Sequence, residues 1–448
     1  MSKNKRSTFS GKLGFVLSAA GASVGLGNIW RFPYLAAKYG GGIFLLVYII
    51  LALTFGYTMI MAETSLGRMT KKSPVGAYQS FGKSKWLSLG GWINAIIPIL
   101  IVPYYSVIGG WVIKYLIGYF SGQAQTLASD TYFSAFISNG ASTEICFIVF
   151  TFCTLGIIYA GVQNGIERVS KFMMPVLVVL SVIIAIYSVT RPGALEGVKY
   201  FLVPNPANFS WMTVVSAMGQ MFYSLSIAMG ILVTFGSYML KDMSIEDSTQ
   251  NVEIFDTAIA IMAGLMIIPA VFAFSGGDPD TLNAGPALMF ITIPKVFANM
   301  GLGTGIGILF FLLVLFAAMT SSIALTESAV STFEDELYWG RKKSTIVMAV
   351  IMVSLGSLSC LGYGPLANVT IIGMQFLDFF DFLTNSVMMP IAAIATCLLV
   401  SRVIGVKKIE EEVTLEGKPF RRKKIFYFMI QYLCPIFAAI ILISSVAN

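Results

Sequence analysis

No histidine occurs among the 448 residues of the chain. Histidine is the side chain that most often serves as a general base near neutral pH and as a ligand of transition metals. Its absence removes the usual parts of zinc sites and of Ser-His or Cys-His catalysis. No other nucleophile stands in a recognisable pattern with a base. The sequence therefore predicts no enzyme.

Cysteine and charge are scarce, whereas apolar residues are abundant. The five cysteines lack CxxC spacing and lie in apolar runs, which is typical of small core residues rather than disulfides: Cys146, Cys153, Cys360, Cys397 and Cys434. Charged residues make up 11% of the chain and hydrophobic residues 56%, with a mean hydropathy of +0.81. This composition predicts a membrane protein with many spans.

Eleven apolar segments, each of about 18 residues or more, are long enough to cross a bilayer. They cover residues 10–36, 42–69, 88–121, 142–161, 165–189, 210–239, 254–275, 301–332, 344–362, 371–401 and 425–446. The positive-inside rule places the N-terminus in the cytoplasm and, because the number of spans is odd, the C-terminus outside. The net charge of +7 then follows from membrane topology, and no nucleic-acid partner is expected. The charged loop at 402–424 is expected to be solvated beside anionic lipid head groups.

The first apolar segment contains an unusual stretch, Gly21 to Pro33. Each of its three glycines, Gly21, Gly25 and Gly27, costs a continuous helix about 1 kcal/mol relative to alanine. In hydrocarbon, unpaired backbone groups are tolerated only where they line a cavity or meet a ligand. A break here would aim carbonyls of one half-helix at a cation and N–H groups of the other at a carboxylate. The alternative, tight packing through small residues, leaves the charged Arg31 unexplained.

A second irregular segment lies five spans later, at Gly219 to Gly230, where hydroxyls and small residues interrupt an apolar helix. One such segment is compatible with packing alone, but two at equivalent positions favour an inverted repeat with a binding site at its interface. The sequence therefore predicts a single transporter domain over residues 1–448. Its first five-helix repeat covers 10–189, the inverted second repeat covers 210–401, and 425–446 adds a further helix.

Several motifs together resemble the neurotransmitter:sodium symporter family. They are Gly25-Leu26-Gly27-Asn28-Ile29-Trp30-Arg31-Phe32-Pro33-Tyr34, Gly40-Gly41-Gly42, Tyr104-Tyr105, Gly165-Ile166-Glu167-Arg168 with Lys171 and Pro175, Thr320-Ser321-Ser322, and Phe333-Glu334-Asp335-Glu336. The resemblance covers nearly the whole chain in order. It implies an all-α LeuT fold, a 5+5 inverted repeat with unwound first and sixth transmembrane helices plus an eleventh helix. Eleven spans resemble the prokaryotic branch, which implies a location in the plasma membrane of a prokaryote.

The resemblance also implies two sodium sites. Site Na2 would use the backbone carbonyls of Gly21, Val24 and Ala317 with the hydroxyls of Thr320 and Ser321, all of them neutral oxygens that suit a monovalent hard cation. Back-bonding of these hydroxyls to the preceding helical turn is the structural alternative. Site Na1 would use the Ser23 carbonyl, the side chains of Asn28, Ser224 and Asp256, and the carboxylate of the substrate.

Asp256 departs from the usual family pattern, which has asparagine at this position in the seventh span. Its carboxylate would supply the negative charge that animal relatives obtain from bound chloride, and the matching chloride-site hydroxyl is replaced by Ala260. The resemblance therefore implies transport that does not need chloride. The alternative for Asp256 is a charge near the surface, at the cytoplasmic end of the seventh span.

The first span has Gly25 where monoamine-carrying relatives place an aspartate. The substrate should therefore bring its own carboxylate, as an amino acid does. The residues implied to bind it are Ser23, Leu26, Gly27, Ile101, Tyr105, Tyr223, Ser226, Met229, Ser321 and Leu325. Since none of them is charged, a neutral amino acid with a hydrophobic side chain is favoured, and Met229 can adapt to several sizes.

Two charged pairs are expected to open and close the path. Arg31 would meet Asp381 above the site, with Asp378 as the rival partner, and Arg6 would meet Asp335 below it, assisted by Tyr238. Pairs that form and break in alternation provide the two discrete states that alternating access needs. Glu63, at membrane depth in the second span, is expected to hydrogen-bond the unwound backbone of the first span.

The resulting prediction is a sodium-coupled symporter that imports a neutral, hydrophobic amino acid with two sodium ions. Two other functions stay open: a proton-coupled amino-acid permease of the same architecture, and an amino-acid sensor that does not transport. The oligomeric state does not follow from the sequence. The lipid bilayer, the amino acid and Na⁺ are the expected partners.

Overall fold

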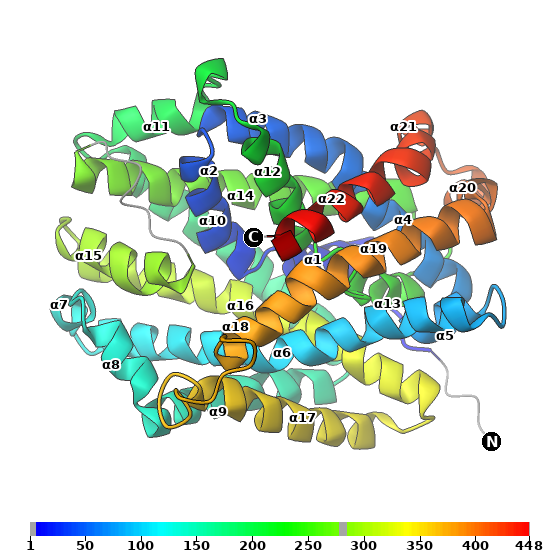
Figure 1. Cartoon of the computed structure of the whole chain (residues 1–448), viewed down its shortest axis with the longest axis horizontal. Helices are drawn as coiled ribbons and strands as arrows, with labels where there is room; N and C mark the ends of the chain where they lie inside the picture. The colour runs from blue at the N-terminus through cyan, green and yellow to red at the C-terminus, as the bar shows by residue number, and fades with distance from the viewer. Residues whose placement is uncertain (1–5, 277–284, 448) are drawn as a thin grey trace.

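The computed structural model describes residues 6–276 and 285–447, which fold into helices joined by short loops, without a β-strand in those ranges. The long helices run side by side (Figure 1), with α5 (Pro74–Gln79), α20 (Val406–Val413) and α21 (Lys423–Phe428) at one end of the molecule. The opposite end carries α7 (Ala124–Leu127), α8 (Tyr132–Ser138), α11 (Ala194–Leu202) and α15 (Ile293–Ala298).

Within the described residues, nine helices are long and apolar enough to cross a membrane. Five of them are single helices: α6 (Lys85–Phe120), α9 (Gly140–Tyr159), α14 (Ile245–Ser275), α16 (Gly303–Glu336) and α17 (Arg341–Leu361). The other four contain π-helical turns. They are α3, η2 and α4 (Gly42–Leu51, Ala52–Gly56, Tyr57–Thr70); η3 and α10 (Val162–Glu167, Arg168–Val189); α18, η7, α19 and η8 (Phe376–Asp381, Phe382–Met388, Met389–Leu398, Leu399–Ile404); and α21, η10 and α22 (Lys423–Phe428, Met429–Leu433, Cys434–Ala447).

Two further spans are broken, as predicted. The first consists of α1 (Lys12–Ser23), followed by the π-helical turn η1 (Gly27–Arg31) and α2 (Phe32–Lys38), and is bent by 53° at the break. The sixth consists of α12 (Trp211–Ser224) and α13 (Ile231–Tyr238). The remaining short elements are η4 (Pro206–Asn208), η6 (Leu288–Thr292) and η9 (Leu415–Gly417). By length and apolar character, the bent first span is the tenth candidate membrane span among the described residues. The shorter helices α12 and α13 occupy the predicted sixth span at 210–239.

The seventh span begins nine residues before the predicted start at 254, because Ser244 caps α14. The Ser244 side chain accepts a hydrogen bond from the Asp247 N–H at 3.2 Å, and Glu246 and Asp247 supply negative charge in the first turn. Both features stabilise a helix N-terminus. The extra turns place Asp256 well inside the helix, where its side chain is fully buried. The alternative of a charge near the cytoplasmic surface is wrong.

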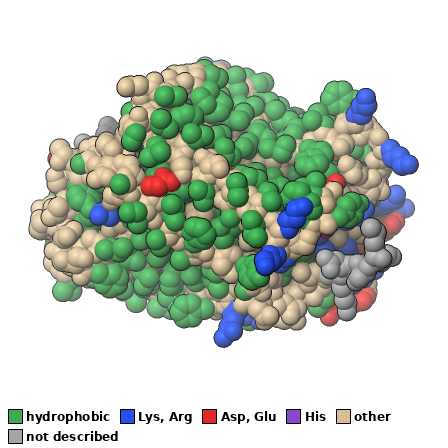
Figure 2. All heavy atoms as spheres, turned by 90° about the horizontal axis from the view of Figure 1, so that it is seen from below, with side chains coloured by type: hydrophobic (Ala, Val, Ile, Leu, Met, Phe, Trp, Pro, Cys, Tyr) green, Lys and Arg blue, Asp and Glu red, His purple; other side chains and the backbone are tan. Residues whose placement is uncertain are grey.

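The surface agrees with a lipid-embedded molecule. Figure 2 shows a face that is covered largely by hydrophobic side chains, with most of its Lys and Arg gathered toward one end. Large apolar side chains such as Phe172, Val179 and Ile443 are more than half exposed. In water such a surface would be unfavourable, whereas lipid tails solvate it.

The loop at 402–424 is more ordered than predicted. Its helix α20 buries Val406, Ile409 and Val413 against the bundle. The fully buried Arg68 of α4 pairs with Glu412 at 2.6 Å and donates a hydrogen bond to the Met243 carbonyl at 2.6 Å. Most of its charged side chains are exposed as predicted, among them Lys407, Lys408 and Glu411, but the segment is not a loop, because its apolar residues form a helix face that packs on α4.

Candidate functional site

The break in the first span lies between Ser23, the last residue of α1, and Gly27, the first of η1. Val24 adopts an extended backbone with ψ of 92°, which ends the helix. A Cβ on Gly25 would lie 2.7 Å from the Ser321 hydroxyl, and a Cβ on Gly27 would overlap the Tyr223 ring. The glycines are therefore required by the close approach of side chains from α16 and α12, as well as by the break itself.

The break in the sixth span lies beside the first. Ser226, Ala228 and Gly230 all have positive φ, at 53°, 59° and 69°, so the chain between α12 and α13 cannot be helical. The Ser226 hydroxyl donates to the Ala22 carbonyl at 2.8 Å, and the Ser23 hydroxyl donates to the Leu225 carbonyl at 3.4 Å. Side chains of each break thus satisfy backbone groups of the other, which the low-dielectric interior requires.

Glu63 hydrogen-bonds the backbone at the break in the sixth span and not at the break in the first. Its carboxylate is fully buried and accepts the Ala228 N–H at 2.8 Å. The prediction that Glu63 bonds the first-span backbone was therefore wrong. The reason is the close packing of α4 on α13: a Cβ on Gly67 would overlap the Val233 carbonyl, and one on Gly236 would overlap the Thr64 carbonyl.

The predicted Na1 residues form one buried cluster around Asp256. The Asp256 carboxylate accepts hydrogen bonds from the Asn28 amide at 2.8 Å and from the Ser224 hydroxyl at 2.9 Å. The Asn28 side-chain oxygen accepts the Gly25 N–H at 3.3 Å, and Ser23 lies at the end of α1 beside this turn. The cluster brings a carboxylate, an amide and a hydroxyl to the point where the two breaks meet.

The predicted Na2 residues also come together, at the contact of α1 with α16. The Ser321 hydroxyl donates to the Gly21 carbonyl at 3.3 Å and the Ala22 carbonyl at 3.1 Å. The Thr320 hydroxyl donates to the Phe316 and Ala317 carbonyls at 3.0 and 3.2 Å, which is the back-bonding named above as the structural alternative. Val24 is fully buried in the adjacent break. Every polar group here is a neutral oxygen.

A small cleft of about 30 Å³ lies between the two breaks. All ten residues predicted to bind substrate line it: Ser23, Leu26, Gly27, Ile101, Tyr105, Tyr223, Ser226, Met229, Ser321 and Leu325, together with Ala22 and Gly25. The Tyr105 hydroxyl accepts the Leu26 N–H at 3.3 Å, beside the backbone that was predicted to meet a carboxylate. Since this volume holds only a few water-sized groups, an amino acid would need side chains such as Met229 to change rotamer.

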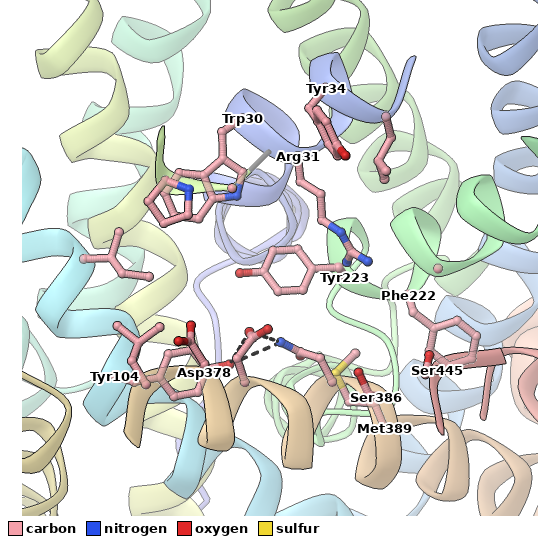
Figure 3. A pocket seen from close by; sticks show the side chains of 18 of the residues that line it. Trp30, Arg31, Tyr34, Tyr104, Phe222, Tyr223, Asp378, Ser386, Met389 and Ser445 are labelled. Atoms are coloured by element: carbon pink, nitrogen blue, oxygen red, sulfur yellow. Dashed lines mark hydrogen bonds between the residues drawn. The ribbon is translucent and has the colours of Figure 1, made fainter. Parts of the chain in front are cut away.

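A larger cavity of about 300 Å³ lies above the cleft, and Tyr223 lines both. Figure 3 shows Arg31 beside the Tyr223 ring, 5.3 Å from its centroid, with Asp378 on the opposite wall. Asp381 accepts hydrogen bonds from Tyr104 at 3.2 Å and from Asn385 at 2.5 Å. Arg31 thus caps the cleft by stacking on Tyr223 and pairs with neither aspartate among the described contacts.

The lower pair is closed. The Nη1 atom of Arg6 lies 2.6 and 2.7 Å from the two carboxylate oxygens of Asp335, and the guanidinium lies 4.9 Å from the centroid of the Tyr238 ring. It also donates hydrogen bonds to Ser237 and Ser331. Phe9 is buried against Phe15, Phe235 and Tyr238 in edge-on contacts. The two predicted pairs are therefore in opposite states, the lower one formed and the upper one apart.

Behind the lower pair, Tyr238 donates to the fully buried Glu327 at 2.7 Å, and Glu327 pairs with Arg341 of α17 at 2.6 Å. We expect Glu327→Ala to lower the free energy of unfolding by about 3–5 kcal/mol, because it leaves a largely buried guanidinium without its partner. Denaturant unfolding in detergent would measure the change. Glu334→Ala is the matched control, since Glu334 lies 3.8 Å from the same Arg341 and is partly exposed; equal losses in both variants would contradict this prediction.

Two residues of the site were not predicted. Tyr48 donates hydrogen bonds to Asp256 at 3.1 Å and to Ser224 at 3.0 Å, and Gln220 donates to the Gly27 carbonyl at 3.0 Å. Both are fully buried. A phenol or an amide in the middle of an apolar span needs a partner, which would have marked both as candidates. The sequence alone, however, does not show which side of the helix they face.

Comparisons with known proteins identify the family to which this chain is similar. A family model described as the sodium:neurotransmitter symporter family matches residues 6–131 and 118–448. The sodium-dependent transporter YhdH of Bacillus subtilis is 34% identical, over 100% of this chain and 99% of its own. A sodium-dependent transporter of Haemophilus influenzae is 31% identical over 98% of both chains. The crystal structure of MhsT in complex with L-phenylalanine has a TM-score of 0.88 and 35% identity, covering 98% of this chain and 100% of that one.

Proposed function

This chain belongs to the sodium:neurotransmitter symporter family, and from that premise we propose that it imports a neutral, hydrophobic amino acid by alternating access. It is a sodium-dependent multi-pass membrane transporter with the LeuT fold rather than an enzyme. The proposal concerns its substrate, its ions and its direction of transport.

The observation that carries the substrate proposal is the uncharged cleft between the two breaks. Its walls are apolar or hydroxylic, and the backbone and the Tyr105 hydroxyl offer the polar groups that a zwitterion needs. Gly25 leaves no carboxylate to meet a free amine, and a side chain there would press on Ser321 and Tyr105. These features favour an amino acid over a monoamine. The solved relative that was crystallised with L-phenylalanine supports the same class.

We assign two sodium ions to the two clusters. Na1 would lie among Ser23, Asn28, Ser224, Asp256 and the substrate carboxylate, and Na2 among Gly21, Val24, Ala317, Thr320 and Ser321. The buried carboxylate of Asp256 supplies negative charge at Na1, and Ala260, fully buried one turn further along α14, offers no hydroxyl for an anion. This arrangement supports transport that is independent of chloride.

The two gates support alternating access. With Arg6 on Asp335 and Arg31 apart from Asp381, the cleft is closed below and adjoins the large cavity above. We place the N-terminus in the cytoplasm and the C-terminus outside, in a prokaryotic plasma membrane, by the positive-inside rule. The repeat boundaries at 10–189 and 210–401 remain predictions.

The test is a thermal-shift screen of the twenty amino acids in sodium and in potassium. Ligands that bind only the folded protein raise its stability by mass action, by about 2.7 kcal/mol at 100 times Kd. We expect stabilisation by large neutral amino acids in sodium and not in potassium, and no effect of charged ones. Uptake by proteoliposomes should require a sodium gradient.

Each alternative function has its own signature. Equal stabilisation in potassium, with uptake driven by a proton gradient alone, would identify a proton-coupled permease. Sodium-dependent binding without counterflow in proteoliposomes would identify a sensor. Either result would overturn the proposal.

A further inference from the structure

Helix α1 is a short element with a joint at one end. Its 12 residues end at the break, where Val24 is extended and the next span half is bent away by 53°. A helix joined in this way can pivot about the break, so its position depends on what holds its other end. The N-cap residue of α1, Gly11, does not hold that end, because it makes no side-chain hydrogen bond.

Polar contacts with α16 and α10 hold that other end, in addition to Phe9, which packs on Phe235 and Tyr238 and donates its N–H to the Tyr238 carbonyl at 3.1 Å. On the α16 side Arg6 pairs with Asp335, as described above. On the α10 side lies Glu167, at the start of that helix, with only 2% of its surface exposed. Its carboxylate accepts the Ser10 N–H at 2.8 Å and also the Ser10 hydroxyl.

The contact with Glu167 is built by several residues. Lys171, one turn along α10, pairs with Glu167 at 2.6 Å and donates to the Ser10 hydroxyl at 3.3 Å. The Gln163 amide donates to the Thr8 carbonyl at 2.8 Å. Gly14 leaves space for the Glu167 carboxylate, because a Cβ at position 14 would overlap it. Residues 8–14 therefore pack against the cytoplasmic start of α10, held by hydrogen bonds to charged groups and by close steric fit.

We propose that Glu167 is a second inner latch, a positioning residue that holds the cytoplasmic end of α1 against α10 while Arg6 holds it against α16. The latch must release for the inner path to open, because α1 cannot pivot with Ser10 bound on this side. The segment that carries Glu167 is itself irregular: it is a π-helical turn that follows Gly161, whose φ is 91°. Both Gly165 and Ile166 donate to the Gly161 carbonyl, at 3.1 Å each.

The proposal rests on the alternating access proposed above, and its test reports on the latch without needing a substrate. Spin labels at Ser7→Cys and Lys342→Cys, both exposed positions, would report the distance between the segment that leads into α1 and helix α17. Cys146 and Cys153, the two cysteines that are not buried, are replaced by alanine in this background. We expect a single short distance for the parent protein in sodium, and a second, longer population in Glu167→Gln, with the ratio of the two changed about tenfold.

Three variants distinguish a latch from a general loss of structure. Glu167→Asp keeps the carboxylate and should restore most of the short population. Asp242→Asn, an exposed carboxylate between α13 and α14, is the matched control and should leave the distances unchanged. Arg6→Ala combined with Glu167→Gln should open the inner side further than either change alone, because the two contacts hold the segment to different helices, α16 and α10.

Sodium provides a second measurement. Since the proposed Na2 site joins α1 to α16, raising sodium should return Glu167→Gln toward the short distance. A parent-like distance distribution in Glu167→Gln, or equal opening in Asp242→Asn, would overturn the latch. Opening that sodium does not reverse supports the latch and contradicts the Na2 assignment, so the two proposals fail separately.

Discussion

Replacing Thr320 and Ser321 together by alanine should weaken sodium-dependent amino-acid binding by about 100-fold or more. The Ser321 hydroxyl donates to carbonyls at the end of α1 at 3.1 and 3.3 Å. The Thr320 hydroxyl donates to carbonyls in the preceding turn of its own helix at 3.0 and 3.2 Å. At the proposed Na2 site they are two of five oxygens. A contact with a charged partner contributes about 1.5–3 kcal/mol, so the loss of two accounts for a factor of this size.

Ser322→Ala is the matched control for this pair. Its hydroxyl lies 3.2 Å from Thr154 on α9 and faces away from the break. We expect its sodium-dependent binding to remain within about twofold of the parent protein. Scintillation-proximity binding with a sodium titration would measure all three affinities. Unchanged sodium dependence in the double variant would contradict the assignment of Na2 ligands to α16.

Asp256→Asn should reduce sodium-coupled uptake by about 100-fold, with or without chloride. Asp256 is the only charged side chain in the proposed Na1 cluster, and the removal of a buried charge that faces a cation costs several kcal/mol. Adding Ala260→Ser should restore part of the uptake in chloride but none in gluconate. Residues 256 and 260 are four apart on α14, so the new hydroxyl would face the same side as the former carboxylate.

Radiolabelled uptake in proteoliposomes, with chloride or gluconate as the anion, would test this prediction. Asp247→Asn is the control, because Asp247 is on the same helix, is partly exposed and pairs with Arg421 at 3.2 Å. It should transport normally with both anions. If uptake by the unmodified protein falls when gluconate replaces chloride, Asp256 does not substitute for the anion and the proposed chloride independence fails.

The breaks were predictable because their cause is local. Three glycines close together in a membrane span, followed by Asn28 and Arg31, have no stable place in a continuous helix. The resemblance supplied α1 as the partner of Ser321, whose hydroxyl donates to the Gly21 and Ala22 carbonyls, whereas the Thr320 hydroxyl donates to carbonyls of its own helix. In both cases the residue types themselves indicate the structure they favour: the glycines a break in the helix, and the hydroxyls an oxygen-lined cation site.

The contacts between helices were less predictable, since they depend on the rotation and tilt of each helix. Glu63 was assigned to the nearer break in sequence, but close packing through Gly67 and Gly236 turns it toward Ala228. Tyr48 and Gln220 went unnoticed for the same reason. Arg31 was assigned to Asp381, but its guanidinium lies over the Tyr223 ring.

The glycine contact between α4 and α13 has a mechanical consequence. With the backbones pressed together at Gly67 and Gly236, the two helices have no clearance to slide past each other. We therefore expect α4 and α13 to move together as one rigid unit if the transporter changes conformation. In that case the hydrogen bond between Glu63 and the Ala228 N–H would persist, and the break in the sixth span would keep its geometry.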